Sequence, residues 1–453
     1  MDPRRQAVNV DVLIHIAGFL HGADLLHLMC TCRAAYFEGT KIQLRAPVTL
    51  HHKNIQAFCA YILSDGCWRA PFLRRLSERF VRLHIGPDAD RIAEMLAKVF
   101  RHACNIQDIR FLHTETLLSA SPELPRAISR LAKVKAISLS RAGPLALGML
   151  TQMSCPFIHV HLSPVHGGWE APCSLFPQRE HLRTLRLNWA RLSPSQAPVS
   201  YPSLRSLNME FARVQDLELL PRLFPNLRHL NLERLGGPVV DDNQAEEARR
   251  HHISQSAISY PWYRVTHVSG DVKTLYMLAF SHEIRRLDVH RMELSSSHIA
   301  ERLAAVLLET RPTHLELEIV LPGAKLGRTS LARLVPAESR LTHLRLTFPS
   351  NQSLLLDMDN FIEALLTLIN QTPLKYLQLD VRPPSRQTDG GTCSPYTLVN
   401  RLIDACPSLR FISIHLRDRK AHFAVTGGGP KDGGYPLEID DAVSSRVMGR
   451  EWM

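Results

Sequence analysis

Three residues near the start of the chain, His27, Cys30 and Cys32, have side chains of the types that bind zinc. In a helix over this segment they would point in different directions and would not meet at one ion. The sequence contains none of the residue spacings of zinc proteases, phosphate-binding loops, serine hydrolases or protein kinases. The glycines before Lys431 are not followed by Ser or Thr, so we interpret them as a flexible segment. We therefore expect no catalytic activity, no metal and no cofactor.

The composition is that of an ordinary globular protein, with 45% apolar and 21% charged residues. No apolar stretch is long enough to cross a membrane, and Asp11 and His15 interrupt the N-terminal apolar run, so we expect neither a membrane span nor a secretory signal. Nine cysteines without a CxxC spacing indicate reduced thiols in the cytoplasm, the nucleus or both. The net charge of +11 can attract nucleic acid, but basic and acidic residues are interleaved, which makes that partner a weak expectation.

The elements that would position a binding site are indicated by an apolar motif that recurs along most of the chain. Residues 182–187 have the form L-x-x-L-x-L, and thirteen copies of this motif start 22 to 35 residues apart. The apolar fourth and sixth positions alternate with polar positions, which predicts a half-buried strand. Clear copies start at Leu182, Leu204, Leu227, Ile284, Leu341, Leu374 and Leu409, and weaker copies start at Phe80, Ile106, Val134, Phe157, Trp262 and Pro312.

Between the motifs, apolar residues recur with the period of an α-helix. One strand with one helix cannot bury its apolar face alone, so the copies must stack on their neighbours. They predict an α/β solenoid with a curved parallel sheet inside and helices outside, and their length resembles that of leucine-rich repeats. Three helical faces consist of Ile92, Met95, Leu96, Val99 and Phe100, of Ile299, Leu303, Val306 and Leu307, and of Phe361, Leu365, Leu366 and Ile369.

Breaks in this periodicity predict three parts of the chain. Residues 1–45 precede the motifs and form a small helical module, and residues 46–416 form the solenoid. Within the solenoid, residues 236–260 interrupt the spacing, and we interpret them as an inserted loop with a charged helical turn. Residues 417–453 lack the motif and contain a glycine cluster, so we expect an irregular C-terminal tail.

The inner, concave face of the solenoid is the predicted binding surface, because the third, fifth and seventh motif positions would project from it. Both signs of charge occur there, together with aromatic residues, and this mixture suits a protein or peptide partner better than nucleic acid. A solvated face without a ligand is the alternative. The predicted target-binding residues are Arg286, Asp288, His290, His314, Glu316, Glu318, His343, Arg345, Tyr376, Gln378, Asp380 and Phe411.

The second motif position is basic in six copies, and these residues would form a ladder along one rim of the sheet. Such a ladder can hold an acidic partner or phosphates. The alternative, which we favour, is that the aliphatic stems cover the sheet edge while the charges reach water. The six residues are Arg183, Arg205, Arg228, Arg285, Lys375 and Arg410.

The N-terminal module contains two predicted helices. The first carries an apolar side made of Val12, Leu13, Ile16, Phe19 and Leu20, and Gly22 ends it. Asp24 is a candidate cap of the second helix. The second helix has its apolar side at Leu25, Leu28, Met29 and Cys32.

This segment resembles an F-box, and its combination with repeats resembles the large F-box family of basidiomycete fungi. Asp11 and Leu13 match the first half of the family motif, and Asp24 with Leu25 begins the second half. Asn9 takes the place of the usual proline, and Ala35 takes the place of the usual tryptophan. Further similarity lies in Val48-Thr-Leu and Phe58-Cys. The resemblance implies that a Skp-type subunit contacts Val8, Asn9, Asp11, Val12, Leu13, Ile16, Leu20, Asp24, Leu25, Leu28, Cys32, Arg33 and Tyr36.

The resemblance implies a non-catalytic adaptor of a Skp–cullin–F-box ubiquitin ligase. Residues 8–45 would bind the Skp-type subunit and thereby the cullin scaffold, and the repeats would hold an unknown protein target. Two alternatives remain open at this stage. The N-terminal helices are a plain cap in a repeat scaffold without a ubiquitin-ligase role, or the positive charge serves nucleic-acid binding.

Overall fold

The structure is a computed structural model that divides into two compact units. The first comprises Met1–Leu204 with Leu223–Pro225, and the second comprises Arg205–Arg222 with Asn226–Met453. The residues described are 9–79, 87–164, 169–170, 176, 179–192, 200–214, 219–235, 241–256, 262–293, 297–320, 331, 334–336, 338–349, 358–381, 394–416, 419–426 and 435–452.

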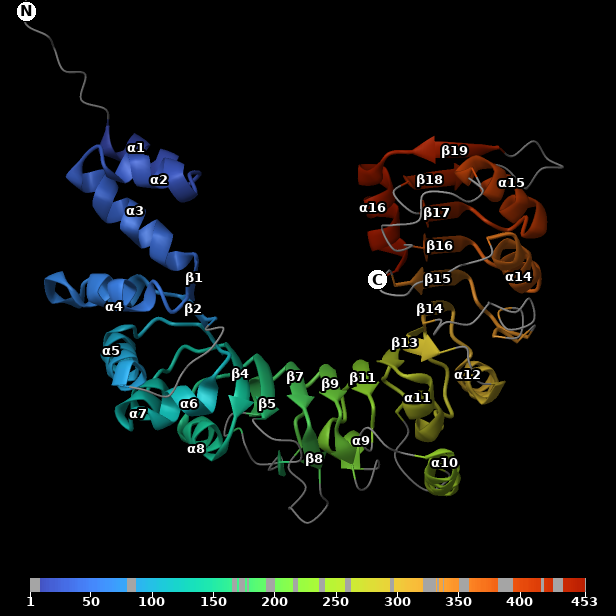
Figure 1. The fold of residues 1–453 in the computed structure, drawn as a ribbon, viewed down its shortest axis with the longest axis horizontal. Helices are drawn as coiled ribbons and strands as arrows, with labels where there is room; N and C mark the ends of the chain where they lie inside the picture. Colours follow the sequence, from blue (N-terminus) through green and yellow to red (C-terminus); the bar gives the residue numbers. More distant parts are fainter. Residues whose placement is uncertain are drawn as a thin grey trace, which may run out of the picture. The chain divides into compact units, whose positions relative to one another are not determined.

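Both units are α/β, with helices packed on a large and mostly parallel sheet (Figure 1). In the first unit, the strands follow the order β1-β2-β3-β4-β5-β7, and the pairs between them are parallel. Its strands are β1 (Pro47–Leu50), β2 (Arg75–Glu78), β3 (Asp108–Phe111), β4 (Ala136–Ala142), β5 (His159–Pro164) and β7 (Thr184–Asn188), with β6 (Trp169–Glu170) paired to β8 (Ala190–Leu192) outside that sheet. Its helices after the N-terminal module are α4 (Ile55–Leu63), α5 (Pro87–His102), α6 (Thr114–Ser119), α7 (Glu123–Ser129) and α8 (Pro144–Gln152), with 3-10 turns at Asp65–Cys67, Ala70–Phe72 and Arg179–His181.

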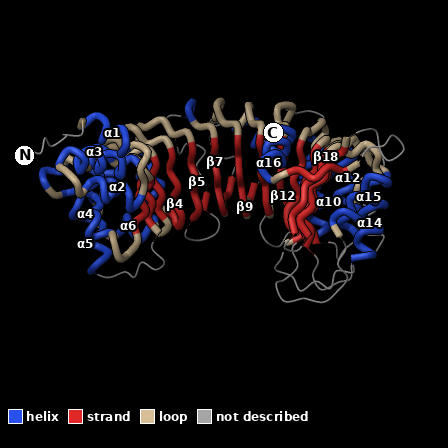
Figure 2. Tube along the Cα trace, turned by 90° about the horizontal axis from the view of Figure 1, so that it is seen from above, coloured by secondary structure: helices blue, strands red, loops and turns tan. Residues whose placement is uncertain are grey.

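In the second unit, parallel pairing runs from β9 to β17, and β18 and β19 then pair antiparallel. The tube view shows strands running side by side (Figure 2). The strands are β9 (Ser206–Glu210), β10 (Arg213–Val214), β11 (His229–Glu233), β12 (His267–Gly270), β13 (Arg286–Glu293), β14 (His314–Val320), β15 (His343–Phe348), β16 (Tyr376–Val381), β17 (Phe411–Leu416), β18 (Arg419–Val425) and β19 (Pro436–Ile439). The helices are α9 (Leu219–Leu223) at the division between the units, then α10 (Asp242–Ser256), α11 (Val272–Leu278), α12 (Ser297–Thr310), α14 (Met358–Asn370), α15 (Pro395–Ala405) and α16 (Asp441–Glu451).

The positions of the strands agree with the motif, and its fourth residue is buried in every described copy. Eleven of the thirteen copies coincide with a strand that begins at the third motif residue. The parallel register then stacks each fourth-position side chain on the next, which makes a continuous apolar core. In the second unit this column consists of Leu207, Leu230, Val268, Leu287, Leu315, Leu344, Leu377 and Ile412, all buried.

One motif copy was placed in the wrong frame, and another lies outside the described residues. The copy at Trp262 is wrong by three residues, since β12 begins at His267 and the motif starts at Val265. Its sixth position is Gly270, where a Cβ would lie only 2.2 Å from the carbonyl oxygen of Leu232, so an apolar side chain cannot fit. The copy at Phe80 lies outside the described residues, and the strand of that repeat is β2, which follows Leu73.

The prediction of an inserted loop at 236–260 is wrong for its described part, because residues 242–256 form the four-turn helix α10. This helix packs against α11 and contributes one buried cation, Arg249. The Arg249 guanidinium donates to the carbonyl oxygen of Tyr276 at 2.6 Å, pairs with Glu309 and lies over the Tyr276 ring. A side chain that is buried because it is hydrogen-bonded can be polar. The packed side of α10 therefore does not appear as an apolar periodicity in the sequence.

The prediction of an irregular tail at 417–453 is also wrong for its described residues. These form β18, β19 and α16, and the antiparallel hairpin extends the sheet beyond β17. Asp440 caps α16 by accepting from the amide of Val443 at 2.7 Å. The helix lies on the side of the strands away from α14 and α15 (Figure 1).

The N-terminal module has three helices where the sequence predicted two: α1 (Val10–Ala17), α2 (Gly22–Met29) and α3 (Arg33–Arg45). Ala17, Leu25 and Met29 form its core. At Gly39 on α3 a Cβ would lie 2.3 Å from Cγ of Met29, so glycine permits the close approach of α2 and α3.

A buried guanidinium joins this module to the next turn of the chain. Arg69 donates to the hydroxyl of Tyr36 on α3 at 3.0 Å and to the carboxylate of Asp65 at 2.9 Å. It also donates to the carbonyl oxygen of Tyr61 at 3.1 Å and lies over the Tyr61 ring. The module therefore shares one polar network with the segment from α4 to the turn that precedes β2.

Arg69→Met should lower the free energy of unfolding of the first unit by about 3 kcal/mol, because it leaves buried acceptors without a donor. Urea denaturation measures the change. The matched control is Arg75→Met, since Arg75 is an exposed strand residue and its loss should cost less than about 0.5 kcal/mol. Equal stability of the two variants would contradict a role for Arg69 in joining these elements.

Candidate functional site

An apolar stripe on the N-terminal module remains exposed although the module has a core of its own. Val12 and Ile16 lie on α1, and Phe19 follows in the turn directly after it; 48%, 42% and 71% of their surfaces are exposed. Leu26 on α2 is 47% exposed. Of the fifteen large apolar residues that are exposed in the described part of the chain, five lie between Val10 and Leu26. Such a concentration is typical of a surface that meets another protein.

Most residues predicted to meet a Skp-type subunit lie at the module surface, with one correction. Leu25 is buried between α2 and α3, so it supports the module and cannot contact a partner. Leu28 and Tyr36 are half-buried against the same core, and the Tyr36 hydroxyl binds Arg69. Val8 lies outside the described residues. The others are exposed or half-buried: Asn9, Asp11, Val12, Leu13, Ile16, Leu20, Asp24, Cys32 and Arg33.

Two predictions in this module are wrong, one about a helix cap and one about an apolar stripe. Asp24 does not cap α2, which begins at Gly22 with His21 as its N-cap residue and has Asp24 in its first turn. Cys32 does not belong to an apolar stripe on α2, because α2 ends at Met29. Cys32 is instead the N-cap of α3, and its sulfur accepts from the amide of Ala35 at 3.4 Å. Asn9 caps α1 by accepting from the amide of Asp11 at 2.9 Å.

The second candidate surface is the sheet face of the second unit opposite its helices, which we call the inner face. Its third motif positions carry a column of stacked rings. His314 and His343 stack with centroids 3.8 Å apart, and His343 and Tyr376 stack at 4.3 Å. Phe411 and His422 continue the column across β17 and β18. The parallel register places His314, His343, Tyr376 and Phe411 opposite one another. His422 comes from the antiparallel strand β18, where the register partner of Phe411 is Ala424.

Charged residues pair along the column and at its start. Arg286 binds Asp288 at 2.8 Å and Glu316 at 3.1 Å, and Arg345 binds Glu316 at 3.2 Å. His267 lies 2.7 Å from Asp288. The charges of this face are therefore matched within the protein, which fits a partner that exchanges individual ion pairs better than a uniformly charged polymer.

At the seventh positions, histidines lie between carboxylates. His290 is 3.9 Å from both Glu233 and Glu318, and His415 is 3.2 Å from Asp380. Most of these groups remain half-exposed.

Helix α16 covers the ring column, which the sequence did not predict. The Trp452 ring stands edge-on to His314 and His343, with centroids 5.8 and 5.9 Å apart, and Arg286 lies over its face at 5.4 Å. Arg286 also donates to the carbonyl oxygen of Trp452 at 3.2 Å, and Nε2 of His314 lies 3.0 Å from that of Glu451. No sequence signal could have placed α16, because the helix lies more than a hundred residues from β13 and β14.

The prediction that all the target-binding residues are exposed is therefore wrong in part. Seven of the predicted residues are half-buried and stay on the accessible inner face: Arg286, His290, Glu316, Glu318, Arg345, Tyr376 and Gln378. The corrected residues are buried under α16, under the hairpin or among their neighbours: Asp288, His314, His343, Asp380 and Phe411.

Burial shifts the protonation of the column. It lowers the pKa of His343 to about 3, with additional repulsion from His314 and nearby basic residues. Burial also lowers the pKa of His314. Burial and the Glu451 carboxylate raise the pKa of Tyr376. These shifts favour the neutral forms of His314, His343 and Tyr376 at pH 7.

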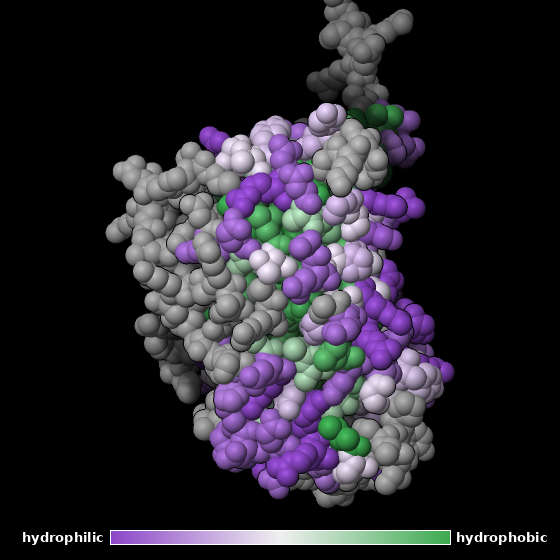
Figure 3. Space-filling view, turned by 90° about the vertical axis from the view of Figure 1, so that its right-hand side faces the viewer, coloured by the Kyte–Doolittle hydropathy of each residue, from purple (hydrophilic) through white to green (hydrophobic). Residues whose placement is uncertain are grey.

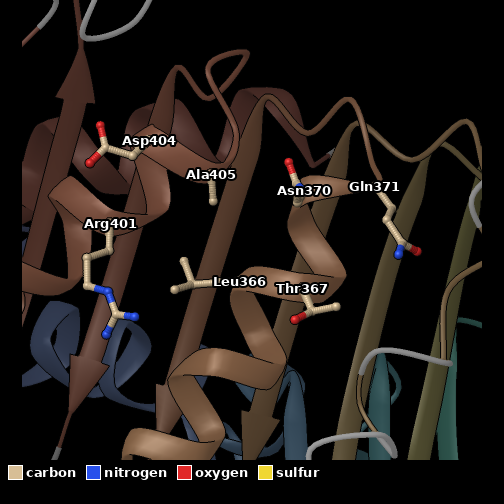
Figure 4. Close-up of a pocket in the computed structure, with 7 residues that line it drawn as sticks. All are labelled: Leu366, Thr367, Asn370, Gln371, Arg401, Asp404 and Ala405. Atoms are coloured by element: carbon tan, nitrogen blue, oxygen red, sulfur yellow. The ribbon is translucent and has the colours of Figure 1, made fainter.

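Two cavities lie away from the inner face. One, of about 380 Å³, is mostly apolar and lies between α2, α3, β1 and α4, where Leu26, Val48 and Phe58 line it. The other, of about 580 Å³, is an open polar groove between the ends of α14 and α15 (Figure 4). Figure 3 shows the side of the molecule that carries these outer helices, and hydrophilic residues dominate its described surface.

The described residues include no group of three or more His, Cys, Asp or Glu side chains that could hold a metal ion. His27, Cys30 and Cys32 do not form such a group, and both cysteines are free. Among the helices that are described, none has the length and apolar character needed to span a bilayer.

The fold and the two surfaces define a repetitive α/β protein with a helical module at its N-terminal end. No protein-family model matches the chain, and no curated protein matches its sequence.

The buried column makes stability depend on pH. An unfolded histidine has a pKa near 6.5, whereas that of folded His343 is about 3, so the unfolded state binds more protons as the pH falls through this window. The free energy of unfolding should fall by about 2 kcal/mol between pH 7 and pH 5 from His343 alone. His343→Phe should remove this part of the pH dependence in urea denaturation of the second unit.

Tyr376→Phe is the control for this experiment, because it keeps the stack and removes no group that titrates between pH 5 and 7. It should retain the pH dependence of the unsubstituted protein. A His343→Phe variant with the same pH dependence as the unsubstituted protein would contradict the role of His343.

Proposed function

We propose that the protein is an F-box protein with leucine-rich repeats that recognises substrates for a Skp–cullin–F-box ubiquitin ligase. The N-terminal module binds the Skp-type subunit, and the inner face of the second unit binds a protein target. The protein itself carries out no chemistry; it holds the target near the catalytic subunits. The observation that carries this proposal is the exposed stripe of Val12, Ile16 and Phe19.

The stripe supports the proposal because, among the described residues, it lies outside the core of the module. Ala17, Leu25 and Met29 already form the core of the module, and the stripe contributes nothing to it. Exposed apolar area costs free energy in water at roughly 25 cal/mol per Å². A docking partner recovers that free energy. The residue spacing that resembles the F-box motif is the reason for proposing a Skp-type subunit as this partner.

The repeated strand and helix support the second half of the proposal. In eleven motif copies a strand begins at the third residue. The parallel pairs bring equivalent positions of successive copies side by side. Leucine-rich repeats have this arrangement. Paired charges and aromatic rings on one face suit a protein or peptide, and they give no uniform basic surface for nucleic acid.

The double variant Val12→Asp, Ile16→Asp should lose binding to a Skp-type subunit, because two carboxylates would be buried in the interface without partners. The measurement is a pull-down of the purified full chain with the Skp subunit. The variant should unfold at the same urea concentration as the unsubstituted protein, since both residues are exposed.

Leu145→Asp is the matched control, because Leu145 is 44% exposed on α8, away from the module. It should bind the Skp subunit as the unsubstituted protein does. Failure of the unsubstituted protein to bind, or equal binding by the double variant, would overturn the adaptor proposal. The repeat scaffold without a ubiquitin-ligase role would then be the better description.

A further inference from the structure

We propose that the inner face of the second unit recognises the C-terminal end of a helix that carries an aromatic residue followed by acidic residues, and that α16 with Trp452 occupies this site until a target displaces it. The inference deepens the proposed function, on which its biological meaning rests, by naming the kind of target segment. It is carried by the contacts of α16, by two unpaired polar atoms and by the basic rim.

The first argument is that the sheet binds the end of α16 through its main chain. The last carbonyl groups of a helix have no partners inside the helix, and this end carries partial negative charge. His314 and Arg286 supply the missing donors, at 3.0 Å from the oxygen of Glu451 and 3.2 Å from that of Trp452. These bonds are made to main-chain carbonyl groups and do not depend on the side chains of the helix. The end of another helix can therefore form them equally well.

The second argument is that the ring column selects an aromatic side chain. The edge of Trp452 meets the flat stack of His314 and His343, and the Arg286 guanidinium lies over its face. Edge-to-face packing and a cation over the ring each favour an aromatic residue at this position. Phe or Tyr in a target helix can replace Trp452.

The third argument is that α16 is held weakly. Among its described residues only Ser444 is buried, so little apolar area attaches the helix to the sheet. Its first turn is held by Asp441, which is exposed and pairs with Lys420 and His422. A helix with so little buried surface can leave without unfolding the sheet beneath it.

The fourth argument is that the contact is incomplete. Nε2 of His343 and Nε1 of Trp452 are buried and have no hydrogen-bond partner among the described residues. An unpaired buried polar atom is destabilising, because it has lost its hydrogen bonds to water without gaining others. His343 is more than nine-tenths buried. A target segment that places a polar group near either atom therefore binds better than α16 does.

The basic rim completes the description of the target. Arg285, Lys375 and Arg410 are exposed at the second motif positions beside the column. Arg285 and Lys375 lie close enough to help lower the pKa of His343, and Arg410 acts on Tyr376 in the same way. Acidic residues after the helix end would meet these cations, which assigns a binding role to part of the ladder that the sequence left as a solvated edge.

The experiment measures whether a second copy of the segment can bind. The probe is a fluorescein-labelled peptide of residues 440–452, titrated by anisotropy into the full chain and into the full-chain variant Trp452→Ala. The internal segment competes with the probe, so weakening it should tighten probe binding at least about tenfold. A peptide with two aspartates after the tryptophan should bind several-fold tighter still, with a steeper salt dependence.

Val443→Ala is the matched control, because Val443 lies on α16 and is 42% exposed. It should leave probe binding as weak as in the unsubstituted chain. Arg286→Gln added to Trp452→Ala should reverse the gain, and circular dichroism with urea denaturation verifies that this chain remains folded. Hydrogen exchange of α16 in the unsubstituted chain should rise when excess peptide is added.

Failure of the inference and failure of the proposed function give different results. Probe binding that is absent from all variants, or equal in Trp452→Ala and Val443→Ala, overturns the inference whatever the Skp pull-down shows. Probe binding that responds as expected supports it, even where the same protein does not capture the Skp subunit.

Discussion

The parallel register of the strands is the constraint on which both the core and the inner face depend. It aligns the fourth motif positions into an apolar column and the third motif positions into a column of rings on the opposite face. A shift of one residue would exchange the two faces of a strand. The aromatic surface is thus a direct consequence of the same backbone pairing that builds the core, and neither can change without the other.

The strand positions and the outer-helix stripes could be predicted because both depend on local periodicity. The stripe of Phe361 and Leu365 on α14 illustrates this success, since both residues are buried. The frame at Trp262 was wrong because close backbone contact forces a glycine where the motif expects an apolar residue. The length of α10 was missed because only Ala245 and Arg249 are buried among its described side chains, and the partners of Arg249 lie far along the chain.

The candidate sites were predictable only as positions on a face. The sequence indicated which residues share the inner face, but the cover of that face comes from a helix of weak amphipathic character. The same limit applies to Leu25 and Tyr36, which the motif resemblance assigned to a partner. Their burial depends on Gly39 and Arg69, and no rule of spacing connects these residues.

The junction after the N-terminal module has a mechanical meaning. Helix α3 ends at Arg45, β1 begins at Pro47, and Arg69 ties Tyr36 to the turn that precedes β2. Nothing in this junction resembles a hinge or a tether. A protein that binds α1 would therefore be held in a fixed orientation relative to the first strands. It would not move freely, as it would at the end of a flexible linker.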